Sequence, residues 1–106
     1  MIAVSNSEVA GKRIVKSLGL VEGNTIRARN LGRDILASLK NIIGGEIEEY
    51  TKLMAESREQ ALDRMSKMAE NMGANAVIGV RFSTSYIMEN AAEILVYGTA
   101  VVCEDI

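Results

Sequence analysis

The chain has 106 residues, of which 48% are hydrophobic, with a net charge of −2 and a pI near 5.2. These values predict one globular domain, residues 1–106, and exclude a general nucleic-acid binder, whose binding surface is basic. The chain has no His and one Cys, so it lacks both the usual neutral-pH general base and an internal disulfide. We expect no membrane span and no signal peptide, and a reducing cytoplasmic location.

The N-terminal third is predicted to form short strands separated by turns. Residues 2–5, "IAVS", are a candidate first strand. The following stretch, "GKRIVKSLGLVEG", alternates imperfectly between apolar and polar residues, with a bend expected at Gly19. Residues 24–30, "NTIRARN", alternate cleanly, which is the period of a half-exposed strand.

Two helices are predicted in the middle of the chain. In "LGRDILASLKNIIGG", residues 31–45, apolar side chains recur every three or four positions, with Asn30 as the N-cap and Gly44-Gly45 at the end. A longer helix is expected over 46–72. Its apolar face carries Ile47, Tyr50, Met54, Ala61, Met65, Met68 and Met72. We interpret these methionines as core residues rather than copper(I) ligands.

The stretch "GANAVIGV", residues 73–80, is interpreted as the end of a helix followed by a buried strand. Gly73 is expected to be a left-handed C-cap, and its distance from Gly79 does not fit a dinucleotide-binding loop. The last strand, "EILVYGTAVVC", is apolar on both faces. Leu95, Tyr97, Val101 and Cys103 face one way, and Ile94, Val96, Ala100 and Val102 the other.

This pattern predicts an α+β fold, in which a small mixed or antiparallel sheet has two helices packed on one face. Because two helices in so short a chain cover one sheet face, something else must cover part of the second. An uncovered apolar face invites aggregation, and association with further copies of the chain would bury it. We therefore expect a homo-oligomer.

An anion-binding site is predicted around Arg27, Arg29, Asn30 and Arg33. The three arginines lie within seven residues of one another, at the expected start of the first helix. A helix N-terminus presents free N–H groups, and guanidinium groups beside it would complete the site. The alternative is a salt-bridge network, within or between subunits, with Asp34 or with the acidic residues Glu46, Glu48 and Glu49.

Cys103 is the weaker candidate, as a ligand of a soft metal ion with Glu104 and Asp105 close in sequence. A single Cys in a chain without His would need symmetry to gather enough ligands. The alternative, a small buried hydrophobic residue, is favoured.

The segments "RARNLGRDILASLKNIIGGEIEEYTKLM" and "GANAVIGVRFSTSYIM…AEILVYGTAVV" resemble the YbjQ-like family, which carries the label "putative heavy-metal-binding". The motifs are R-N-x-x-R-D, G-G-E…Y, G-A-N-A-V-x-G-V-R-F and Y-G-T-A-V, and the match runs nearly end to end. The resemblance implies a small cytoplasmic α/β protein that forms a ring-like homo-oligomer, a pentamer. It implies no established biochemical activity.

Two classes of function remain open. The first is a non-enzymatic oligomeric protein that binds a metal or a small anion at subunit boundaries. The second is an enzyme whose site is assembled between subunits from Arg29, Arg33, Asp34, Glu46 and Tyr50. The binding protein is favoured, because no activated nucleophile or perturbed base can be named.

Overall fold

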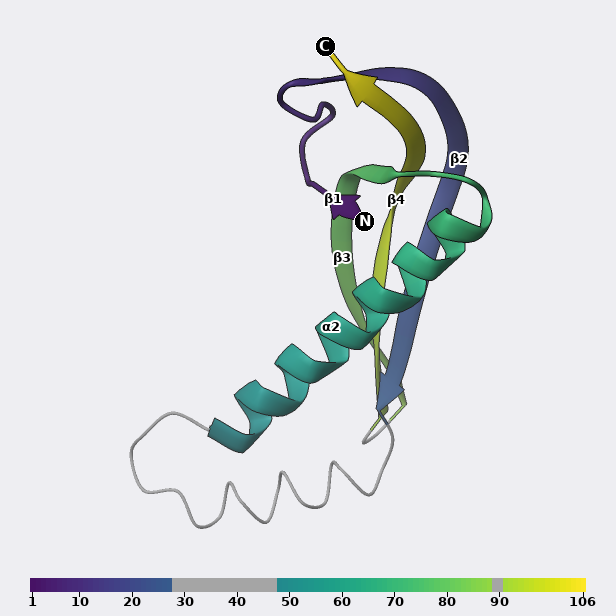
Figure 1. Ribbon diagram of the computed structural model, residues 1–106. Coiled ribbons are helices and arrows are strands. Elements are labelled where there is room, and N and C mark those ends of the chain that lie inside the picture. The colour runs from purple at the N-terminus through teal and green to yellow at the C-terminus, as the bar shows by residue number, and fades with distance from the viewer. Residues whose placement is uncertain (28–47, 89–90) are drawn as a thin grey trace.

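The computed structural model describes residues 1–27, 48–88 and 91–106. The elements are β1 (Ile2–Ala3), β2 (Lys12–Arg27), α2 (Glu48–Asn71), β3 (Ala76–Met88) and β4 (Ala91–Asp105), as Figure 1 shows. The first predicted helix, residues 31–45, lies outside the described residues. The part of the chain that the structure describes is a small α+β fold with one helix, and that helix is not of a length and apolarity that would cross a membrane.

The sheet is mixed and has the strand order β1-β3-β4-β2. β4 is paired antiparallel with both β2 and β3, and the short β1 adds to β3 in parallel. The predicted first strand is confirmed at Ile2–Ala3, but the prediction of separate short strands after it is wrong, because residues 12–27 form a single strand. Gly19 adopts a φ of +118°, and the register with β4 shifts beside it, so the predicted bend is a β-bulge that leaves the strand continuous.

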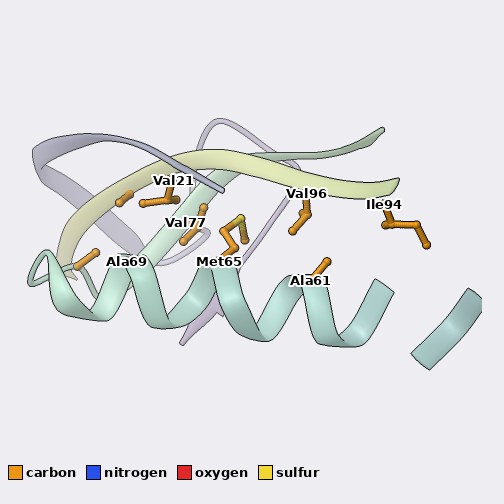
Figure 2. Close-up of a cluster of buried hydrophobic side chains, with 9 residues drawn as sticks. Val21, Ala61, Met65, Ala69, Val77, Ile94 and Val96 are labelled. Atoms are coloured by element: carbon orange, nitrogen blue, oxygen red, sulfur yellow. The ribbon is translucent and has the colours of Figure 1, made fainter. Parts of the chain in front are cut away.

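One face of the sheet is covered by α2, which runs obliquely across β2 and β4 (Figure 1). Side chains of α2 and of the three long strands form the core between the two layers, and Figure 2 shows the Met65 side chain directed from the helix towards the sheet. The buried members are Val21, Ala61, Met65, Ala69, Ala74, Val77, Ile94, Val96 and Ala100.

The buried stripe of α2 differs from the predicted one. Ser57, Ala61, Met65 and Ala69 recur every four residues and are fully buried, whereas Met68 and Met72 are exposed. Three of these four side chains are small, which brings the helix backbone close to the strands. Ser57 is tolerated in the core because its hydroxyl donates to the Leu53 carbonyl oxygen at 2.8 Å, while its own carbonyl accepts from the Thr25 hydroxyl at 3.1 Å.

The prediction for residues 73–80 is confirmed. Gly73 has a φ of +90°, its amide donates to the Glu70 carbonyl at 2.9 Å, and the Ala74 amide donates to the Ala69 carbonyl at 3.0 Å. These bonds close the last turn of α2, and β3 begins three residues after Gly73.

The two apolar faces of β4 are also confirmed, and each has its own cover. Ile94, Val96 and Ala100 lie under α2. On the other face, Val101 and Cys103 join Ala76 in a second buried cluster, packed against Val9, Ile14 and Ile78. The N-terminal segment, residues 1–11, therefore covers one end of the face opposite α2.

We predict that Gly23→Ala destabilises the fold by at least about 2 kcal/mol. A Cβ at position 23 would overlap the carbonyl oxygen of Ala61 and lie 2.5 Å from the Met65 amide nitrogen. Both contacts are with helix backbone, so relief requires α2 to move away from β2. Urea unfolding at a fixed protein concentration measures the effect.

The matched control is Glu59→Ala, an exposed position on the solvent side of α2. Its free energy of unfolding should stay within about 0.5 kcal/mol of wild type. Equal stabilities for the two variants would show that α2 does not approach β2 this closely.

Candidate functional site

Of the four residues of the predicted anion site, the structure describes Arg27. Arg27 is the last residue of β2 and stands opposite Ala92 of β4 in the strand register. Arg29, Asn30 and Arg33 follow it in the chain and lie outside the described residues. Of the residues in the alternative enzyme site, Arg29, Arg33, Asp34 and Glu46 also lie outside them, and Tyr50 belongs to the first turns of α2.

Cys103 lies near the end of β4, and its side chain is buried at 5% exposure. The side-chain amide of Asn75 holds this residue at both of its backbone groups. The Cys103 amide donates to Asn75 Oδ1 at 2.8 Å, and Asn75 Nδ2 donates to the Cys103 carbonyl oxygen at 2.7 Å. The thiol Sγ lies 3.4 Å from the same Oδ1, within range of a third, weaker hydrogen bond.

The two carboxylates that follow Cys103 are held in ion pairs across the sheet. Glu104 pairs with Arg13, and Asp105 Oδ1 lies 2.7 Å from Lys12 Nζ. The hydrogen bond and charge of Lys12 lower the pKa of the Asp105 carboxyl, and the reverse effect raises the pKa of Lys12. These groups are exposed to solvent, so they fix the strand ends weakly.

A metal site among the described residues has little support. Within residues 1–27, 48–88 and 91–106, no three side chains of the types His, Cys, Asp and Glu come together in a group able to hold a metal ion. The two carboxylates next to Cys103 in sequence, Glu104 and Asp105, form ion pairs with Arg13 and Lys12. A soft-metal site at Cys103 therefore does not fit the donor set that surrounds it.

A second feature is the part of the sheet that no segment described by the structure covers. On the face opposite α2, the N-terminal segment covers the end around Cys103, and we call the remaining part the open face. Leu20 is 73% exposed on it, and Tyr97 is 39% exposed. A groove of about 340 Å³ runs from this face around the outer edge of β2 to α2. It is lined by Leu20, Glu22, Leu95 and Tyr97 on the open face, and by Val21 and the α2 residue Met68 on the other side.

The outer edge of β3 is also incomplete, and we call residues 82–87 the β3 free edge. The N-terminal segment follows β3 as far as Val80, whose amide donates to the Val4 carbonyl at 3.0 Å. Next to this contact, the Arg81 guanidinium group donates to the Ser5 carbonyl oxygen at 2.8 Å. Beyond it, no described strand pairs with β3 on this side, and Phe82, Tyr86 and Ile87 are exposed.

The solvent side of α2 is acidic. Glu56, Glu59, Gln60 and Asp63 line a shallow surface hollow. Asp63 forms an i,i+4 ion pair with Lys67, with 3.2 Å between Oδ2 and Nζ. Exposed carboxylates along a helix are typical of the solvated side of an amphipathic helix, so this surface defines no ligand site.

Comparison with known proteins assigns the family. The model of the YbjQ-like family, described as "Putative heavy-metal-binding", matches residues 1–104, so the chain belongs to this family. A UPF0145 protein of Dehalococcoides mccartyi strain BAV1 is 58% identical over 104 residues, which are 98% of this chain and 100% of that protein. A UPF0145 protein of Pyrococcus abyssi is 54% identical over 104 residues, with 98% of this chain and 91% of that protein covered.

A solved structure has the same fold. It is a crystal structure of a protein of unknown function, assigned to the DUF74 family, from Pediococcus pentosaceus. The TM-score is 0.65 at 16% sequence identity, and the match covers 98% of each chain. At this identity the similarity concerns the fold alone.

Sequence reasoning missed Asn75 as the partner of Cys103. The two residues are 28 positions apart, and no local pattern links them. The only available signal was the position of Asn75 just after a helix C-cap, where an Asn side chain commonly bonds to backbone groups. The cross-strand partner of such a side chain becomes visible only with the strand register.

Proposed function

We propose that the protein is a non-enzymatic homo-oligomer that binds a small ligand, an anion in preference to a metal, at its subunit boundaries. The observation that carries the proposal is the incomplete sheet of the described residues, which leave an open face, the β3 free edge and an outer edge of β2 without a paired strand.

The free edge of β3 supports self-association. The sequence from Phe82 to Ile87 is "FSTSYI", which has no charge and no proline to discourage pairing. Tyr86 is 84% exposed in the isolated chain, although an aromatic side chain has a large apolar surface to bury. Such an edge in a free monomer would promote disordered aggregation, which closed association prevents.

The dimensions of the chain agree with this proposal. The Cα radius of gyration is 17.1 Å, whereas a compact domain of this length has about 13 Å. An extended subunit has more surface to bury against its neighbours. Closed rotational symmetry would cover the edges of every copy, and the resemblance to the YbjQ-like family supplies the number five.

The ligand proposal follows from the position of the arginine segment. Among the described strands β2 is an outer one, and it ends at Arg27, two residues before Arg29 in the chain. Asn30 and Arg33 follow Arg29. An arginine cluster that follows an outer strand would lie near a neighbouring subunit if that strand edge takes part in assembly. Guanidinium groups bind phosphate and sulfate in paired, directional hydrogen bonds.

We predict that light scattering gives one particle whose mass is a multiple of the 11.5 kDa chain, five-fold for a pentamer. Tyr86→Lys should lower this mass, because it places a charge on the β3 free edge without disturbing a buried residue. Glu59→Lys, on the solvent side of α2, is the control that should keep the wild-type mass.

A monodisperse wild-type particle of 11.5 kDa at micromolar concentration would refute the assembly. A stable dimer or hexamer would refute the pentamer only. Full assembly of Tyr86→Lys would exclude the β3 free edge from the interface.

We predict that inorganic phosphate or sulfate raises the melting temperature of the wild type, because a ligand that binds only the folded state stabilises it. Arg33→Ala should lose this shift. Arg58→Ala removes the same charge from an exposed position of α2 and should keep it. An unchanged shift in Arg33→Ala places the site elsewhere, and the absence of any shift in the wild type contradicts the anion proposal.

A further inference from the structure

We infer that the thiol of Cys103 is a structural group, held in a hydrogen-bonded clamp by Asn75, and that this chain has no heavy-metal site built on it. The family description points to a heavy metal, and Cys103 is the only thiol that the sequence offers. The structure gives this thiol another role. The inference stands independently of the proposed anion binding.

The side chain of Asn75 supplies the hydrogen bonds that one further residue of β3 would make to β4. The pairing of β3 with β4 reaches Ala76 opposite Val101 and goes no further, while the Asn75 amide still donates to the Val101 carbonyl at 3.1 Å. Beyond this point the side-chain amide of Asn75 acts as a surrogate peptide group. It satisfies the backbone amide and the carbonyl of Cys103 together, in the manner of one further strand residue.

The direction of these bonds fixes the orientation of the Asn75 amide. The Cys103 backbone N–H can only donate, so the atom that faces it must be Oδ1. The thiol then lies 3.4 Å from an acceptor oxygen and acts as a donor through its S–H. A metal-bound thiolate has no proton to donate, and its negative charge would face the lone pairs of this oxygen.

The surroundings of the thiol are unsuited to a metal. Cys103 packs with Ala76 and Val101 against the apolar side chains Val9, Ile14 and Ile78. A thiolate and its metal would have to be accommodated in this cluster, where charge is costly. A soft-metal site needs three or four donors at bonding distance, and the described residues bring no such group together.

Assembly does not reverse this burial. The side chain is already 5% exposed in the isolated chain. Docking of further copies onto the described fold only removes accessible surface. A rotation axis could bring exposed thiols of several copies together. It could not do so for Cys103, because this thiol is buried beneath the N-terminal segment of its own chain.

Cadmium provides the test, because a cadmium–thiolate bond has a characteristic ultraviolet absorption. The assembled wild-type protein is titrated with Cd²⁺, and bound metal is counted by equilibrium dialysis. We expect no thiolate absorption and the same bound metal in wild type and Cys103→Ser. Metal that binds equally to both proteins belongs to other donors and agrees with the inference. Thiolate absorption with metal that is lost in Cys103→Ser would overturn it.

Thiol accessibility gives a second readout that needs no metal. The native thiol should react slowly with an aromatic disulfide reagent, at a rate that Cd²⁺ leaves unchanged. Asn75→Ala should raise this rate about tenfold by loosening the end of β4. Asn24→Ala, an exposed change distant in sequence from the clamp, is the matched control. Fast reaction of the wild type, or no difference between the two variants, would contradict the clamp.

Discussion

The arrangement of the molecule depends on the contact between α2 and Gly23 of β2. A side chain at this position would overlap the helix backbone at Ala61, so the helix lies close to β2 only because glycine leaves the space. The stripe of Ser57, Ala61 and Ala69 supplies the matching small residues on the helix. This close packing gives a well-filled core over β2 and β4. Because the helix is held over β2 and β4, it leaves much of β3 uncovered on this face.

The consequence is that the described residues cover each face of the sheet only in part. On one face α2 follows β2 and β4, and the aromatic side chains Phe82 and Tyr86 on β3 remain exposed. On the other face the N-terminal segment buries Cys103 and Val101 and pairs with β3 up to Val80. It leaves Leu20 and Tyr97 exposed. A single small chain rarely leaves such apolar surface in water. This exposed apolar surface is the observation on which the proposed assembly rests.

The sequence predicted those features that depend on local patterns. The C-cap at Gly73 and the two apolar faces of β4 follow from residue type and period, and both are confirmed. The continuity of β2 through Gly19 could not be read from the sequence, because a bulge and a turn both place glycine at a break in alternation. The predicted apolar face of α2 was wrong at Met68 and Met72, since the helix contacts the sheet along a narrower stripe of every fourth residue. Of the candidate site, Cys103 was placed correctly in an apolar strand, but its bond to Asn75 depends on strand register.

Hydrogen–deuterium exchange of the β3 free edge in the purified protein tests the central claim, that the sheet is completed by another copy of the chain. In an isolated chain, the amides of residues 82–87 that point away from β4 have no described partner strand and should exchange as fast as those of an open edge. If another copy covers this edge, the same amides will be protected for as long as those of β4. Rapid exchange at the edge, with protection confined to β4 and α2, would contradict the account.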